Sequence, residues 1–181
     1  MKWMIASDIH GSAYYCRKLI ECYHNENTDR LILLGDILYH GPRNDLPAEY
    51  APKKVISMLN AHKDEIFCVR GNCEAEVDQM VLEFPVLADY ALLSFGDRMI
   101  FATHGHLFSE AHLPPLRQGS LFLYGHTHIP ACHACGEIVC INPGSVSIPK
   151  EGSEHSYMVF ADGEFSWKRL PDGEEYRRYR I

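Results

Sequence analysis

The sequence lacks any apolar run long enough to cross a membrane. Its first apolar run, residues 2–6, meets Asp8 almost at once and is too short for a signal peptide. Basic side chains are scarce, because 17 lysines and arginines stand against 24 aspartates and glutamates, which gives a net charge of -7. This balance argues against a nucleic acid or an anionic membrane as partner. We therefore expect a cytoplasmic protein without a membrane partner.

The chain also has no linker, internal repeat or low-complexity segment. Its 181 residues suit one domain with a sizeable core, so we predict a single domain over residues 1–181. Seven cysteines are an odd number and too sparse for a disulfide scaffold, which predicts reduced thiols. Cys16 and Cys22 fall on the apolar face of a predicted helix and are expected in the core.

In the first half of the chain, apolar strands alternate with helices. We predict strands at residues 2–6, 31–34 and 65–69, and helices over 12–25, 52–62 and 74–82, the first beginning at the N-cap Ser12. Between the second strand and the second helix lies a long loop, residues 37–50, of a length that is usually functional. This alternation predicts parallel strands with a site at their carboxyl ends.

The second half contains short strands separated by turns. We predict strands at residues 90–95, 98–103, 120–124, 138–141, 157–160 and 164–170. They indicate a second sheet, mixed or antiparallel, that packs on the first with helices outside. The charged tail, residues 172–181, is expected to be a solvated end.

Five apolar strands are each followed by residues that bind metals. Carboxylate, amide and imidazole groups are suitable ligands for divalent cations. One tetrahedral ion needs fewer ligands than this set offers, so we predict two ions. The residues, in chain order, are Asp8, His10, Asp36, Asn72, His104, His106, His126 and His128.

These motifs, in this order, resemble the calcineurin-like metallophosphoesterase superfamily, most of all its small bacterial phosphodiesterases of the YfcE type. The resemblance covers nearly the whole chain. It implies an α/β fold, a four-layer αββα sandwich of two mixed β-sheets flanked by helices. The segments that carry it are ASDIHG (6–11), GDIL (35–38), HGPRN (40–44), RGNC (70–73), VDQM (77–80), THGHLF (103–108), GHTH (125–128) and NPGSVSIP (142–149).

Carried onto this sequence, the resemblance implies a dinuclear site in which Asp36 bridges two ions. Manganese is the metal that it suggests. His126 and His128 would then serve different ions. The implied ligands of one ion are Asp8, His10, Asp36 and His128, and those of the other are Asp36, Asn72, His104 and His126.

The chemistry of such a site can be argued independently. Two cations about 3.5–4 Å apart can share a hydroxide that attacks phosphorus in line with the leaving oxygen. A carboxylate such as that of Asp36 suits the bridging position, because each of its two oxygens can bind one ion. We therefore expect metal-dependent hydrolysis of a phosphodiester bond in a small phosphoester substrate.

The candidate catalytic residues are Asn72, Cys73 and His106. Many members of the superfamily have a histidine at the position of Cys73, close to the leaving group, whereas a thiol is a poor proton donor. His106 is a free imidazole and could take that role, or it could be a merely supporting residue. Arg43 in the long loop could contact a phosphate or be an ordinary surface arginine.

Several alternatives stay open from the sequence. The protein could be a phosphomonoesterase or a nucleotide pyrophosphatase, or a non-catalytic interaction scaffold of the same fold. Its oligomeric state is undetermined, and a homo-oligomer is compatible with the sequence. Cys132, Cys135 and Cys140 could suggest a zinc ribbon or a redox pair, but one CxxC is too few for a ribbon, and we expect a hairpin with incidental cysteines.

Overall fold

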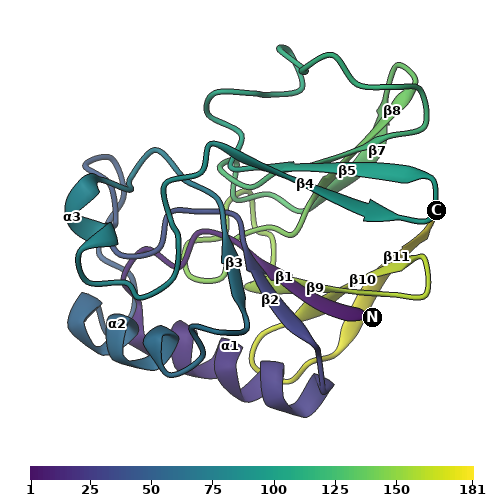
Figure 1. Cartoon of the computed structure of the whole chain (residues 1–181). Helices are drawn as coiled ribbons and strands as arrows, with labels where there is room; N and C mark the ends of the chain where they lie inside the picture. Colours follow the sequence, from purple (N-terminus) through teal and green to yellow (C-terminus); the bar gives the residue numbers. More distant parts are fainter.

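Two mixed β-sheets face each other in the computed structural model, which describes all 181 residues (Figure 1). The six-stranded sheet has the order β11-β10-β9-β1-β2-β3, and the five-stranded sheet has the order β4-β5-β6-β8-β7. The strands of the first sheet are β1 (Lys2–Ala6), β2 (Arg30–Leu33), β3 (Ile66–Cys68), β9 (Ser156–Ala161), β10 (Glu164–Arg169) and β11 (Glu175–Arg180). Those of the second are β4 (Tyr90–Phe95), β5 (Arg98–Thr103), β6 (Leu121–Leu123), β7 (Ala131–Cys135) and β8 (Ile138–Asn142). Both sheets contain parallel and antiparallel pairs, as predicted.

The helices α1 (Ala13–Glu26) and α2 (Pro52–Asn60) lie on the outer face of the six-stranded sheet (Figure 1). The short α3 (Glu76–Gln79) has no buried residue and stands apart beside the loops. Ser12 caps α1 as predicted, because its hydroxyl accepts a hydrogen bond from the backbone N–H of Tyr15 at 3.2 Å. Cys16 and Cys22 lie on the buried face of α1, which confirms their predicted place in the core.

The alternation of side chains along β1 produces two apolar cores. Met4 and Ala6 point toward the helices, whereas Trp3 and Ile5 point into the space between the two sheets. This is the period of two that a strand imposes when both of its faces are buried. The core between the sheets is completed mainly by large side chains of β9 and β10 and by apolar residues of β5, β6 and β8.

The outer face of the five-stranded sheet is covered by a loop, where we had expected helices. Phe108, Leu113 and Leu116 of residues 104–120 pack against the third apolar cluster, which includes Phe122. This segment contains no helix. Pro114 and its neighbour Pro115 explain the difference, since prolines in a helix interior remove a hydrogen bond and clash with the preceding turn.

Two strands were not predicted from the sequence. The tail forms β11, which pairs antiparallel with β10, although most of its residues are exposed, as a solvated end would be. Arg177 and Tyr179 are its partly buried residues, and Arg177 lies over the ring of Trp167 at 5.1 Å, so charge concealed an edge strand. The other is β7, which pairs with β8 and contains both cysteines of the CxxC motif.

The parallel strands bring their carboxyl ends to one edge. β1, β2 and β3 are parallel in one sheet, and β5, β6 and β8 are parallel in the other. The loops that follow these strands carry the residues that we predicted as ligands. No helix in the structure is both long enough and apolar enough to cross a membrane.

Trp167 joins the two sheets by a buried hydrogen bond, and its loss should be measurable. Its indole N–H donates to the carbonyl of Asn142 in β8 at 2.7 Å. Trp3 lies in the same core and makes no hydrogen bond within the protein through its indole, so it is the matched control. We expect Trp167→Phe to lower the free energy of unfolding by about 1–3 kcal/mol more than Trp3→Phe, because a buried carbonyl loses its partner. Urea unfolding of the metal-free proteins measures this difference, and equal losses would contradict it.

Candidate metal centre

The residues that bear the predicted ligands adopt an unusual backbone conformation. Asp8, His10, Asp36, His126 and His128 all have φ between 49° and 64°, in the left-handed region that side chains other than glycine rarely adopt. Such conformations cluster at functional sites, where the surrounding structure holds them in place. The backbone N–H groups of Asp8 and His10 bond to the carbonyls of Gly35 and Asp36, which ties the first two strand-end loops together.

Glycines next to the predicted ligands allow the strand-end loops to pack closely against one another. A Cβ atom on Gly71 would overlap the carboxylate of Asp36, and one on Gly125 would overlap the side chain of Ser7. Neither position requires a positive φ, so the requirement is for space.

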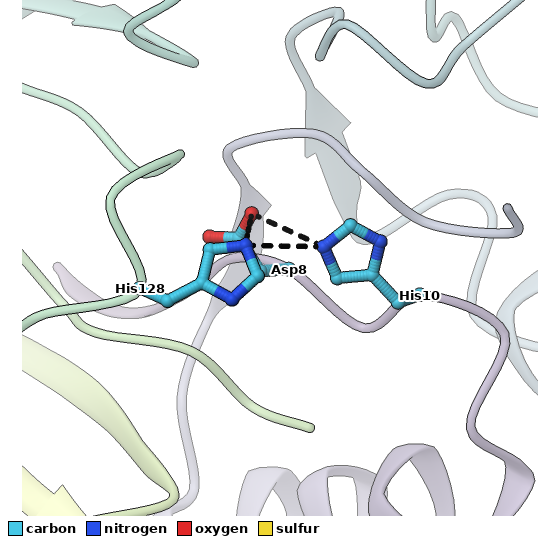
Figure 2. Close-up of side chains that lie close together, drawn as sticks. All are labelled: Asp8, His10 and His128. Atoms are coloured by element: carbon cyan, nitrogen blue, oxygen red, sulfur yellow. Dashed lines mark hydrogen bonds and ion pairs between the residues drawn. The ribbon is translucent and has the colours of Figure 1, made fainter. Parts of the chain in front are cut away.

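Asp8, His10 and His128 form the first group of ligand atoms (Figure 2). Asp8 Oδ1 lies 3.2 Å from His128 Nε2 and 3.6 Å from His10 Nε2. The two Nε2 atoms are 3.2 Å apart. All three side chains are buried, although His128 is far from the other two in the sequence.

Asp36, Asn72, His104 and His126 form the second group. His104 Nε2 lies 3.4 Å from Asp36 Oδ2, 3.2 Å from Asn72 Oδ1 and 3.1 Å from His126 Nδ1. His104 is fully buried, His126 is half-buried and Asn72 is exposed. The structure therefore puts His126 and His128 in different groups, as the sequence had suggested.

Asp36 lies between the two groups and contacts both through one oxygen. Its Oδ2 is 3.6 Å from His10 Nε2 and 3.4 Å from His104 Nε2. Its Oδ1 accepts a hydrogen bond from the backbone N–H of Cys73 at 2.9 Å. We had expected each oxygen to face one ion. In the structure Oδ2 faces both groups, and Oδ1 keeps a second lone pair beside its bond to the Cys73 amide, so this expectation stays a prediction.

The hydrogen bonds of the imidazoles test whether cations fit here. His10, His104 and His128 each place Nδ1 within 2.6–2.8 Å of a backbone carbonyl, to which it donates its proton. In the neutral ring this leaves Nε2 with a lone pair, which in all three residues faces the ligand groups. Asp8 Oδ1 is buried without a hydrogen-bond partner. Lone pairs that converge in a buried space require a cation, so the donor set fits divalent metals.

The charges in the metal-free protein agree with this view. Burial opposes ionisation of Asp8, but the adjacent imidazoles outweigh it and hold the pKa of this carboxyl well below its usual value. The pKa of Asp36 is lowered against burial in the same way, mainly by His104. Burial likewise opposes protonation of His104, yet the nearby carboxylates raise its pKa to about 9. Without metal, protons on the imidazoles offset the carboxylate charge, and metal binding would displace them.

A cleft of about 490 Å³ opens onto the two groups. Asp36, Asn72, His126 and His128 line it, and the long loop contributes Arg43. The sequence had left the role of Arg43 open, and the structure places it in the wall of the cleft. The complete lining is Asp36, Gly41, Pro42, Arg43, Asn44, Asn72, Cys73, His126, Thr127, His128 and Lys150.

The two candidate proton donors differ in position. Cys73 lines the cleft, and burial together with Asp36 raises the pKa of its thiol. His106 does not line the cleft, although its ring centre is 5.4 Å from that of His104. Burial and the neighbouring imidazoles lower the pKa of His106 to about 4.

Sequence reasoning missed Glu74, which organises two of the ligand loops. Its buried carboxylate accepts hydrogen bonds from the backbone N–H groups of Asp36, Ile37 and Gly71 at 2.6–2.8 Å. These bonds fix the loop of Asp36 against the loop of Asn72. Its place directly after the Gly-Asn-Cys motif was the only signal in the sequence.

The segment 142–149 supports the ligand loops from the other side. Asn142 donates through Nδ2 to the carbonyl of Gly125 and to the hydroxyl of Thr127. Ser145 and Ser147 both donate their hydroxyls to the carbonyl of Asp8. We had favoured a structural turn here, and the segment does position the ligand loops without lining the cleft. Lys150 follows it directly and was also missed, because nothing in the sequence marks one lysine as part of a cleft.

Comparisons with known proteins agree with this geometry. Residues 1–162 match the calcineurin-like phosphoesterase superfamily domain. The chain is 48% identical to phosphodiesterase YfcE of Escherichia coli over 172 residues, which cover 95% of this chain and 94% of that protein. It is 28% identical to a phosphodiesterase of Methanocaldococcus jannaschii over 80% of this chain and 83% of that protein.

Among solved structures, a phosphoesterase from E. coli superposes with a TM-score of 0.96 at 44% identity, and all of both chains is covered. Vacuolar protein sorting 29 from Cryptosporidium parvum shares the fold, with a TM-score of 0.62 at 15% identity over 99% of this chain and 98% of that chain. The chain therefore belongs to the calcineurin-like phosphoesterase superfamily, whose members use divalent metal ions.

Glu74 should support metal binding without touching a metal. We expect Glu74→Gln to weaken Mn²⁺ binding by about 10- to 100-fold, the usual effect of removing a group that orients ligands, because the amide sets its own N–H donors against the backbone donors. Glu76→Gln, an exposed change two residues along the chain, is the matched control. Calorimetric titration of Mn²⁺ into the metal-free proteins gives the affinities. Equal affinities in the two variants would show that Glu74 does not position the ligand loops.

Proposed function

We propose that this protein is a phosphodiesterase that hydrolyses small phosphodiesters with two divalent metal ions. One observation carries the proposal: seven ligand side chains from five strand ends form two groups that share Asp36 Oδ2. One ion would be held by Asp8, His10, Asp36 and His128, and the other by Asp36, Asn72, His104 and His126. We favour manganese, which the resemblance suggests and which nitrogen and oxygen ligands accept.

When bound, such a pair of cations activates water as a nucleophile and offsets charge on the phosphoryl oxygens. The protein contributes the fixed positions of the ligands. The imidazoles of His10, His104 and His128 are each held by an Nδ1 bond to a carbonyl. Asp36 is held by the amide of Cys73 and, through its backbone, by Glu74. These bonds keep the ligands in place before the substrate arrives, so little reorganisation is needed during the reaction.

Arg43 and Lys150 would bind the substrate. Both line the cleft beside the ligand groups. Their positive charges lie in a protein with a net charge of -7, so they provide a local attraction for an anionic ester. The cleft volume of about 490 Å³ suits a small molecule, and the acidic surface disfavours a polynucleotide.

The leaving group would depart on the side of Cys73. Cys73 lines the cleft and His106 does not, so Cys73 is the better placed of the two candidate donors. A thiol is a weak acid, which favours esters whose leaving groups need little protonation. Aryl esters should therefore react faster than alkyl esters.

Three further properties belong to the proposal. We propose that residues 1–181 form a single domain, since both sheets share one apolar core. We also propose a cytoplasmic location, which the five free cysteines support. Assembly into a homo-oligomer is compatible with the exposed apolar side chains of β4, among them Tyr90 and Leu92.

A substrate panel tests the function. We expect the manganese-loaded protein to hydrolyse a bis-aryl phosphate faster than an aryl monophosphate, with a cyclic dinucleotide as the third substrate. Asp36→Asn should lose more than about 100-fold in rate and most of its bound metal, because the change removes a charge shared by both ions. Asp45→Asn, in the same loop but outside the cleft lining, is the matched control.

The alternatives predict other results. A faster reaction with the monophosphate would favour a phosphomonoesterase. No turnover of any ester with manganese, magnesium or zinc would favour a scaffold, and full activity of Asp36→Asn would refute the shared ligand.

His126 and His128 should serve different ions. We expect His126→Ala and His128→Ala each to retain one tightly bound metal ion where the native protein holds two, because each removes a ligand from one group only. His112→Ala, on an exposed loop, controls for the loss of any imidazole. Elemental analysis after gel filtration counts the ions, and electron paramagnetic resonance separates a coupled manganese pair from a single ion. Loss of both ions in both variants would mean that the two histidines act on one metal.

A further inference from the structure

A second cluster of metal-binding side chains lies outside the cleft, on the β7–β8 hairpin. In the strand register His133 is directly opposite Cys140, and Cys135 lies two residues beyond His133 on the same strand. Directly opposed residues share a face of a sheet, as do residues two apart on a strand. One imidazole and two sulfurs therefore project from the same face.

Glu110 joins this cluster from the loop that covers the sheet. Its Oε2 lies 3.2 Å from His133 Nε2, and its other oxygen accepts a hydrogen bond from the hydroxyl of Tyr124. The ligand atoms of Glu110, His133 and Cys135 all lie within 4.8 Å of one another. A carboxylate that is oriented by a second side chain is typical of metal sites.

The two sulfurs can exist in two states. In the structure Cys135 and Cys140 form a disulfide, with their Cα atoms 6.1 Å apart. This bond corrects the expectation that all seven cysteines are reduced and that these three are incidental. A disulfide sulfur is not a thiolate ligand, so a metal could bind here only after reduction. The spacing of the pair, four residues between the cysteines, falls within the range found in zinc sites.

We propose that the reduced hairpin binds one zinc ion through Cys135, Cys140, His133 and Glu110, and that the disulfide and the zinc complex are alternative states of the same site. A dithiol or phosphine reductant supplies the two electrons that break the sulfur–sulfur bond, and the two sulfurs take up two protons. Zinc binding then releases both thiol protons to solvent. Two thiolates, one imidazole and one carboxylate complete a tetrahedral set.

The chemistry of this site separates it from the metal centre in the cleft. The cleft offers nitrogen and oxygen ligands, whereas the hairpin offers two sulfurs, which select zinc over manganese. All four positions are filled by the protein, which is the arrangement of a structural site. Zinc would hold the loop of Glu110 against the hairpin. Glu110 bonds to Tyr124, which directly precedes the loop 125–128.

Cobalt provides the test, because a cobalt–thiolate bond gives a near-ultraviolet charge-transfer band that nitrogen and oxygen ligands do not give. The full-length protein is reduced with a phosphine, freed of excess reductant and titrated with Co²⁺ without oxygen. We expect the band to appear with one equivalent of cobalt per chain and to disappear on addition of Zn²⁺. The oxidised protein should show no such band.

Variants assign the band to this site. Cys135→Ser should abolish it, and Cys140→Ser should do the same if circular dichroism shows that the buried substitution leaves the fold intact. Tyr124→Phe should weaken cobalt binding by about 10-fold, and His133→Ala by more. Cys132→Ser and Cys73→Ser are the matched controls and should keep the band, since Cys132 lies on the other face of β7 and Cys73 lines the cleft.

Four outcomes would overturn the proposal. Three are a band in the oxidised protein, a band that survives Cys135→Ser, and no band in the reduced native protein. The fourth is loss of the band in Cys73→Ser, which would assign the thiolate to the cleft instead. None of these outcomes bears on the phosphodiesterase proposal, because the two sites share no ligand.

Discussion

The structure depends on holding metal-binding groups together in a buried space, where only protons or cations can offset their charge and the repulsion of their lone pairs. Asp8 Oδ1 meets two Nε2 atoms at 3.2–3.6 Å in a buried space, and His104 Nε2 meets three further donor atoms at similar distances. Groups free to move would separate or bind water. Here the Nδ1 bonds fix the rings, and left-handed backbone at five ligand residues fixes the chain. Each such conformation costs of order 1–3 kcal/mol, which the surrounding fold must supply.

The fold supplies this free energy through contacts that lie behind the candidate ligands. Glu74 ties the loops after β2 and β3 together with three bonds, and Asn142 ties the loop after β6 to β8. Asn142 is itself bonded through its carbonyl to Trp167 in the opposite sheet. The packing between the sheets is thus connected to the metal ligands through one residue, so a change in the core can reach the site without touching a ligand.

The sequence predicted which side chains come together, because each follows an apolar strand, and parallel strands must bring those ends to one edge. It also predicted β1, β4 and β5 with their observed bounds. It failed where charge obscured the pattern, as in β11, and where function depends on contacts between distant segments. Glu74 and Lys150 look like ordinary charged residues until the fold buries one and places the other in the cleft. Glu110 and the hairpin cysteines are more than 20 residues apart, so spacing could not reveal their cluster.

The position of β1 has a consequence for how the chain reaches this structure. Residues 3–6 pair on one side with β2, close in sequence, and residues 2–5 pair on the other side with residues 158–161 of β9. The second pairing closes a loop over almost the whole chain, and the entropy of that closure is lost before the new contacts repay it. During synthesis on a ribosome, β1 must wait with an open edge until β9 emerges. Asp8, at the end of that strand, is made well before its partner His128, which can join it only after the intervening chain has emerged.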